Sequence, residues 1–86
     1  MAGKKDLRED LQEWVMEAIE GLGGGGTLVE VSREVWRRHE EDLREAGDLF
    51  YTWQYDIRWA AQVLRDEGKL MPANQVPRGV WALAAP

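Results

Sequence analysis

The chain has 86 residues, a formal net charge of −5 and no cysteine. This length corresponds to a single domain. The lack of cysteine excludes disulfides, thiolate catalysis and cysteine-based zinc sites. Because the sequence contains neither a signal peptide nor a long apolar run, we expect a cytoplasmic protein and not a secreted or membrane protein.

The charge is distributed unevenly along the chain. Residues 1–22 and residues 23–50 each carry a net charge of −3, whereas residues 51–86 carry +1. The overall acidity argues against a generic nucleic-acid binder. The weakly positive C-terminal part nevertheless indicates which part of the chain would meet an anion.

The first predicted helix covers about residues 4–22. Its apolar residues recur every three or four positions and form one stripe. They are Leu7, Leu11, Trp14, Val15, Ala18, Ile19 and Leu22. Gly21 or Gly23 can end the helix in the left-handed conformation. Residues 23–26 are all glycine and predict a loop. This loop lacks the Gly-Lys-Ser/Thr ending of a phosphate-binding P-loop, so we interpret it as a connection.

The second helix is predicted over about residues 28–38. Thr27 and Glu30 have the spacing of a capping box, in which each side chain accepts a hydrogen bond from the other residue's backbone N–H. Glu34 and Arg38 are spaced for a favourable i,i+4 ion pair. The residues expected to face the core are Leu28, Val31, Val35 and Trp36.

The helical pattern weakens over residues 39–51, a variable segment. These residues extend the second helix or form a separate turn, with Leu43 as the one clear apolar anchor. His39 is the only histidine and precedes three acidic residues. Zinc prefers several His or Cys ligands, and Leu43 stands where the zincin pattern requires a second histidine. We therefore interpret the segment as a solvated charged turn, and we expect neither a metal nor a cofactor.

The third helix is predicted over about residues 52–67, with Asp48 or Thr52 as its N-cap and Gly68 at its end. At about 100° per residue, one arc is apolar and faces the core. It comprises Trp53, Ile57, Ala60, Ala61 and Leu64. The opposite side is polar and comprises Tyr55, Arg58, Gln62 and Arg65, with Gln54, Trp59 and Asp66 at its margins.

A β-hairpin is predicted over residues 69–84, with strands at Lys69–Met71 and about residues 79–84. In the second strand Trp81 and Leu83 share the face toward the core. A third short strand fits near Thr27. The expected fold class is therefore mostly α with a small antiparallel sheet (α+β), and a helix that leads into a hairpin is typical of a winged helix-turn-helix.

Several segments resemble the winged-helix domain found at the N-terminus of Mrr-type restriction endonucleases, and related small winged-helix proteins of bacteria. They are Leu22–Gly24 with Thr27–Val31, Asp56–Leu70, and Arg78–Leu83, which reads R-G-V-W-A-L. The resemblance covers most of the chain from the first helix onward. It implies a DNA-binding accessory or regulatory domain, and it does not extend to the nuclease domain of those enzymes.

The candidate DNA-binding residues lie on three predicted elements. On the third helix they are Gln54, Tyr55, Arg58, Gln62 and Arg65. On the hairpin they are Lys69, Asn74, Gln75 and Arg78. At the second helix, whose N-terminus can hold a phosphate, they are Thr27, Arg33 and Arg37. Arg58 can pair with a guanine edge and Gln62 with adenine. Tyr55 can contact a phosphate or a base step and Arg65 a phosphate. The alternative is that all these residues form an ordinary polar surface.

Trp59 and Trp36 are candidates for an interface. Trp59 lies away from the core arc, so either a partner or residues 47–52 of the same chain cover it. No Ser-His-Asp or Cys-His arrangement can be assembled, and we expect no enzyme. The leading prediction is non-enzymatic binding of double-stranded DNA, as a transcriptional regulator or accessory factor. The alternative is a winged helix that binds a protein and not DNA, and a homodimer is compatible with either.

Overall fold

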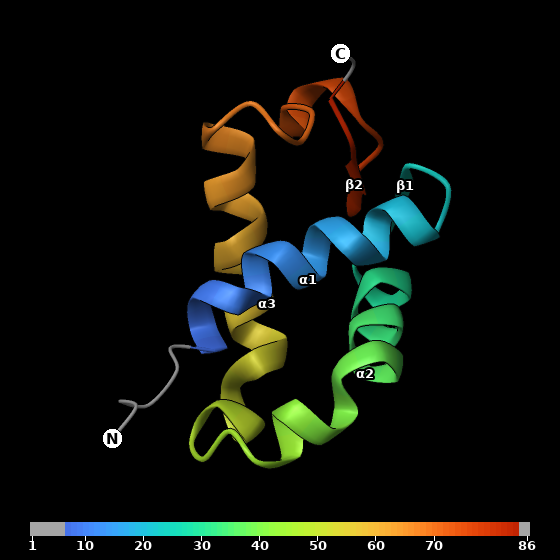
Figure 1. Ribbon diagram of the computed structural model, residues 1–86. Coiled ribbons are helices and arrows are strands. Elements are labelled where there is room, and N and C mark those ends of the chain that lie inside the picture. The colour runs from blue at the N-terminus through green and yellow to red at the C-terminus, as the bar shows by residue number, and fades with distance from the viewer. Residues whose placement is uncertain (1–6, 85–86) are drawn as a thin grey trace.

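The computed structural model describes residues 7–84 and the side chains of residues 9–84. This part of the chain contains three α-helices, a short 3-10 helix and two paired strands (Figure 1). In chain order they are α1 (Leu7–Gly21), β1 (Gly25–Thr27), α2 (Leu28–Arg44), α3 (Leu49–Asp66), η1 (Ala73–Gln75) and β2 (Val80–Ala82). The α+β class predicted from the sequence is confirmed. No helix in residues 7–84 is both long and apolar enough to cross a membrane.

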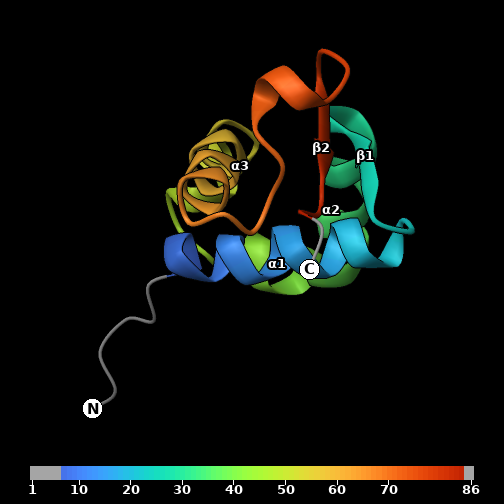
Figure 2. The ribbon, with the colours of Figure 1, turned by 90° about the horizontal axis from the view of Figure 1, so that it is seen from above.

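The helix α1 lies across the other two helices. It packs most extensively on α3 and also contacts α2 and β1. The views in Figures 1 and 2 show α3 on one side of the molecule, α2 and the strands on the other, and α1 spanning the distance between them. The predicted start of this helix at residues 4–6 lies outside the described residues.

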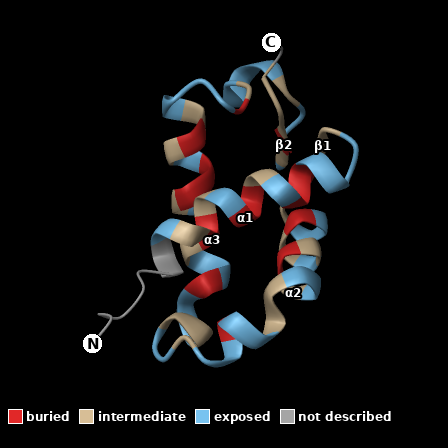
Figure 3. Ribbon diagram, in the orientation of Figure 1, coloured by how far each residue is buried: buried red, intermediate tan, exposed pale blue. Residues whose placement is uncertain are grey.

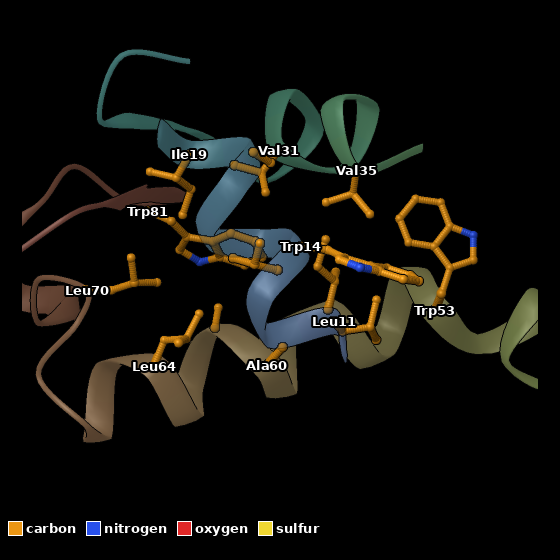
Figure 4. Close-up of a cluster of buried hydrophobic side chains, with 14 of the residues drawn as sticks. Leu11, Trp14, Ile19, Val31, Val35, Trp53, Ala60, Leu64, Leu70 and Trp81 are labelled. Atoms are coloured by element: carbon orange, nitrogen blue, oxygen red, sulfur yellow. The ribbon is translucent and has the colours of Figure 1, made fainter. Parts of the chain in front are cut away.

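The core lies between the three helices, and Figure 3 shows buried residues on each of them. From α1 it takes Leu11, Trp14, Val15, Ala18 and Ile19, and from α3 the complete predicted arc of Trp53, Ile57, Ala60, Ala61 and Leu64. Leu22, at the end of the predicted stripe, is exposed instead. Figure 4 shows side chains from all three helices converging with Leu70 and Trp81. Burying one such aliphatic side chain stabilises the fold by roughly 1.5–3 kcal/mol.

The helices α1 and α3 end in the same way. Gly23 and Gly68 adopt the left-handed conformation with φ of 96° and 78°. The N–H of Gly24 donates to the Ile19 carbonyl at 2.9 Å, and the N–H of Lys69 donates to the Leu64 carbonyl at 2.9 Å. These bonds satisfy carbonyls that the end of a helix leaves unpaired. The predicted helix ends are therefore confirmed, with Gly23 chosen over Gly21.

The helix α2 is longer than predicted. Its capping box is confirmed: the Thr27 N–H donates to Glu30 at 2.8 Å, and the Glu30 N–H donates to Thr27 Oγ1 at 3.2 Å. The helix continues to Arg44 across a kink at His39, where φ is −130° and ψ is 26°. Leu43 is fully buried. The kink turns this residue into the core, which explains why the helical pattern of the sequence breaks while the helix continues.

The helix α3 starts at Leu49, earlier than predicted. Asp48 occupies the N-cap position, but its side chain makes no cap hydrogen bond. Thr52 lies inside the helix, where its hydroxyl donates to Asp56 Oδ2 at 2.8 Å. Leu49 packs against the core, and the Phe50 ring lies 6.4 Å from Trp36. These apolar contacts extend the helix toward the N-terminus without a side-chain cap.

The glycine run is only partly a loop. Residues 25–27 form β1, which pairs antiparallel with β2 so that Gly25 faces Ala82 and Thr27 faces Val80. A side-chain carbon at Gly25 would lie 3.4 Å from the Cβ of Ala82, so the two strands approach closely here. The prediction of a loop through residue 26 is therefore wrong, and the short strand predicted near Thr27 begins two residues before it.

The predicted hairpin is reduced to a bridge and one short strand. Leu70 forms an isolated antiparallel bridge with Leu83, and the N–H of Met71 donates to the Ala82 carbonyl at 2.9 Å. Lys69–Met71 is not a strand, because Pro72 follows it directly as the N-cap of η1. The strand β2 thus lies between β1 and residues 69–71. Trp81 is buried and Leu83 packs against the core, as predicted.

Candidate functional site

A groove of about 570 Å³ separates α3 from the loop that precedes β2. It is lined by Leu28, Arg58, Gln62, Arg65, Ala73, Val76, Pro77, Arg78, Gly79 and Trp81. We call it the arginine groove. It brings together three candidates from α3 and one from the hairpin, because the loop returns to β2 alongside the outer face of α3.

The arginine groove contains no carboxylate among its lining residues. Arg58 and Arg78 are exposed, and neither forms an ion pair with any residue whose side chain the structure describes. The carboxylates of α1 lie elsewhere: Glu9, Glu13, Glu17 and Glu20 line a separate groove. The unpaired positive charge and this acidic face are therefore on different parts of the surface.

The outer face of α3 holds two kinds of polar side chain. Tyr55 and Arg58 point into solvent, and Tyr55 is 77 % exposed. Gln62 is exposed, but its Nε2 donates to Asp66 Oδ1 at 3.0 Å. Arg65 is half-buried and its Nη2 donates to the Val80 carbonyl at 3.3 Å. This bond links α3 to β2, and because Arg65 also lines the arginine groove, the phosphate contact predicted for it stays a prediction.

The other hairpin candidates lie apart from Arg78. Lys69 pairs with Glu67 at 3.4 Å and lines the acidic groove of α1. Asn74 and Gln75 are exposed on η1 and do not line the arginine groove. The structure thus groups only Arg78 of the four predicted hairpin residues with the face of α3.

At α2 the three candidates also differ. Thr27 is engaged in the capping box. Arg37 pairs with Glu34 at 2.5 Å, and Arg38 pairs with the same carboxylate at 2.8 Å. The hydrogen bonds from Arg37 and then Arg38 lower the pKa of Glu34 from 4.5 to about 2. The i,i+4 spacing predicted the pair of Glu34 with Arg38. The pair with Arg37 was not predicted, although its i,i+3 spacing is also suitable.

Arg33 is the α2 candidate that remains without an ion pair among residues 9–84, and it borders a second groove of about 840 Å³ between α2 and α3. The lining residues are Leu28, Val29, Ser32, Arg33, Trp36, Phe50, Trp53, Gln54, Tyr55 and Arg58. We call it the aromatic trough. It adjoins the arginine groove, because Leu28 and Arg58 line both.

The two tryptophans proposed for an interface are half-buried. Trp36 stacks on Trp53 with ring centroids 5.9 Å apart and an angle of 10° between the planes. The guanidinium of Arg44 lies 5.2 Å from the centre of the Trp36 ring. Trp59 packs against the core and is not on the outer polar face. Trp36 therefore belongs to the aromatic trough, whereas Trp59 lies at the edge of the core.

His39 is more enclosed than a solvated turn would be. Its ring stacks on Trp14 with centroids 4.1 Å apart, and its Nε2 lies 2.8 Å from Glu17 Oε1. The solvated-turn interpretation is wrong for this residue, because the kink turns the imidazole toward α1. Within residues 9–84, no three His, Cys, Asp or Glu side chains are placed to hold a metal ion.

These contacts define the chemistry available at the surface. Arg33, Arg58 and Arg78 are exposed guanidinium groups without carboxylate partners among the described side chains. Such groups can bind phosphate oxygens or base edges in a fork geometry. In comparisons with protein families, curated proteins and solved structures, nothing matched this chain.

Proposed function

We propose that this chain is a winged helix-turn-helix domain that binds double-stranded DNA and catalyses no reaction, as a transcriptional regulator or accessory factor. The order of elements supports the fold. The helix α1 is followed by β1, α2 and α3, and the chain then returns as β2 between β1 and residues 69–71. In this proposal α3 is the recognition helix, and residues 72–79 form the wing.

The observation that carries the proposal is the arginine groove. The chain has a net charge of −5, yet no carboxylate lines this groove and two of its arginines are unpaired among the described residues. Phosphates dominate the affinity of proteins for DNA, so an acidic protein needs a face from which its carboxylates are excluded. The lining of the arginine groove meets that requirement, and the Asp66 carboxylate beside it accepts a hydrogen bond from Gln62.

The contacts suggest a role for each side chain. Arg58 is free to pair with a guanine edge in the major groove. In this proposal Arg78, on the loop, contacts the phosphate backbone. Gln62 can reach adenine only after leaving Asp66, to which it donates a hydrogen bond at 3.0 Å. Arg65 on α3 donates to the carbonyl of Val80, the first residue of β2, which lies two residues after Arg78. Arg65 therefore positions Arg78 relative to Arg58.

The test is a titration of fluorescently labelled duplexes of mixed sequence at about 50 mM and about 200 mM salt. If Arg33 and Arg78 each neutralise a phosphate, log affinity falls with log salt with a slope of roughly −2, because the guanine edge assigned to Arg58 carries no charge. Failure of every duplex to bind at the lower salt would refute the proposal.

A matched pair of variants locates the surface. Arg58→Ala with Arg78→Ala removes two charges from the arginine groove. Arg44→Ala with Lys69→Ala removes the same charge from residues that pair with Glu40 and Glu67 outside it. We expect only the first pair to weaken binding strongly. Equal losses would mean that net charge, and not this groove, governs the affinity.

A second candidate function is protein binding without DNA binding. The aromatic trough favours it, because Val29 and Tyr55 expose 61 % and 77 % of their surfaces at its border. The same titration separates the two, since a protein-binding module would show no salt-dependent binding to any duplex.

A further inference from the structure

The aromatic trough has an apolar floor that the proposed DNA contacts do not use. Trp53 is almost completely buried at its base, and Trp36 stacks on it at 5.9 Å. Phe50 lies beside Trp36, with ring centroids 6.4 Å apart. The trough is the larger of the two adjoining grooves, at about 840 Å³. Large aromatic side chains at the base of an open groove are typical anchors for a protein partner.

The border of the trough is apolar as well as its floor. Val29 on α2 is 61 % exposed and Tyr55 on α3 is 77 % exposed. Small ligands usually bury most of their surface in an enclosed pocket. A trough with such exposed borders therefore suits a chain segment that lies along two helices better than a small molecule.

The charged residues that line the trough are all positive. Arg33 and Arg58 border it, and no carboxylate lines it. The acidic residues of α2 nearest in sequence are engaged elsewhere. Glu30 accepts from the Thr27 N–H at 2.8 Å, and Glu34 pairs with Arg37 and Arg38. Neither neutralises the two border arginines, so the trough offers apolar surface between positive charges.

We propose that the aromatic trough binds an acidic amphipathic segment of a partner protein. The apolar side chains of the segment lie on Trp36, Phe50 and Val29. Its carboxylates pair with Arg33 and Arg58. This is the helix-in-groove mode of recognition, with charge complementarity setting the specificity. Such a partner is negatively charged, as DNA is, but it also carries an apolar stripe that DNA does not have.

The shared residue Arg58 has a regulatory consequence. It lines both the aromatic trough and the arginine groove. A bound acidic segment would therefore remove Arg58 from the DNA contacts, and the two ligands would compete. Binding of the segment is independent of the proposed function, whereas this competition rests on it.

The test is a selection from a library of random peptides displayed on phage. The wild-type protein serves as the target, and a folded Val29→Glu, Arg33→Glu variant is used to deplete other binders. We expect the enriched peptides to combine Asp or Glu with large apolar residues spaced three or four apart. A synthetic copy of one such peptide should bind with micromolar affinity and change the intrinsic tryptophan fluorescence of the protein.

A milder pair of variants controls for folding. Arg33→Ala should lower the affinity for the synthetic peptide by roughly tenfold, the loss expected for one charge-assisted hydrogen bond. Arg78→Ala removes another exposed arginine, which lines the arginine groove and not the trough, and should leave peptide affinity unchanged. Equal effects of the two variants would overturn the assignment of the site.

Other outcomes of the selection also decide the matter. Enriched peptides that are neutral or basic, or that bind the Val29→Glu, Arg33→Glu variant equally well, would refute the acidic segment. If no peptide is enriched, the inference is refuted, whether or not the protein binds duplex DNA. Peptide binding without DNA binding would instead leave this inference intact and refute the proposed function.

Discussion

The imidazole of His39 stacks on the indole of Trp14, with ring centroids 4.1 Å apart and an angle of 10° between the planes. The stack joins α2 to α1 at the residue where α2 departs from helical dihedral angles. Glu17 on α1 adds a contact of 2.8 Å to His39 Nε2. The kink is thus held by a side chain, and it directs the last turn of α2 so that Leu43 is buried.

His39→Ala should lower the free energy of unfolding by about 1–2 kcal/mol, because it removes the stack and the contact with Glu17. For a domain of this size, each kcal/mol corresponds to a decrease in Tm of roughly 4–8 °C. Thermal unfolding followed by circular dichroism measures the change. His39→Phe, which retains an aromatic ring but loses the contact with Glu17, should be less destabilising. Equal losses for both variants would show that the stack contributes nothing.

Glu34 makes stability depend on pH in the acidic range. Its pKa is lowered from 4.5 to about 2 by Arg37 and Arg38 in the folded protein. A group whose pKa falls on folding stabilises the protein above its unfolded pKa and loses that contribution as pH decreases to the folded pKa. We therefore expect a stability difference between wild type and Glu34→Gln that shrinks between about pH 4.5 and about pH 2.

Urea unfolding of both proteins at several acidic pH values tests this dependence. Arg44→Ala is a suitable comparison, because it disrupts another i,i+4 pair, with Glu40, and leaves Glu34 intact. If the wild-type and Glu34→Gln curves remain parallel from pH 5 to pH 2, the ion pairs do not couple Glu34 to folding.

The helical faces could be predicted from the sequence. Trp53, Ile57 and Leu64 are buried as their spacing requires, because helical periodicity records which side of a helix meets the core. The strand β1 could not be predicted in full, because two of its three residues are glycine and show no alternation of apolar and polar side chains. The pairing of Gly25 with Ala82 joins residues that are distant in sequence, and no local pattern reports such a contact.

The candidate site was predictable only as a set of residues. Helical spacing placed Arg58 on the outer face, where the structure also has it. Whether an arginine is free depends on its neighbours. Arg37 is paired with Glu34 and Arg65 bonds to Val80, and the second contact depends on the path of the C-terminal loop. The stack of His39 on Trp14 is also a tertiary contact without a local signal.

The left-handed conformation of Gly68 makes it sensitive to substitution. Its φ is 78°, and a side-chain carbon there would meet no other atom within 4 Å, so any cost is conformational. Gly68→Ala should destabilise the protein by about 1–2 kcal/mol. Gly68→Asn should cost less, because asparagine tolerates this conformation. Chemical denaturation measures both, and a larger loss for asparagine than for alanine would contradict this explanation.

Arg65 and Arg58 should be separable by their effects on stability. Arg65 donates to the Val80 carbonyl at 3.3 Å, whereas Arg58 is exposed and unpaired among the described side chains. Arg65→Ala should lower the free energy of unfolding by about 1 kcal/mol and weaken DNA binding. Arg58→Ala should weaken DNA binding with stability nearly unchanged. An opposite pattern would assign the positioning role to Arg58.

Arg58 and Tyr55 should contribute differently to base readout. They are three residues apart on α3, so they lie next to each other on its outer face. Gln62 is already bonded to Asp66. A guanidinium that pairs with guanine N7 and O6 contributes about 1–3 kcal/mol of discrimination at one base pair. Arg58→Ala should therefore remove the preference for guanine at one position of a selected duplex, and Tyr55→Ala should leave that preference in place.

Base analogues identify the contact on the DNA side. Replacing the preferred guanine with 7-deazaguanine removes N7. This replacement should weaken DNA binding by the wild-type protein but not by the Arg58→Ala variant. Replacing a neighbouring thymine with uracil removes only the 5-methyl group, an apolar contact suited to the ring of Tyr55. Suppose that 7-deazaguanine weakens DNA binding by the wild type and by Arg58→Ala equally. Arg58 then binds a phosphate and does not read that base, because a phosphate contact does not depend on the neighbouring base.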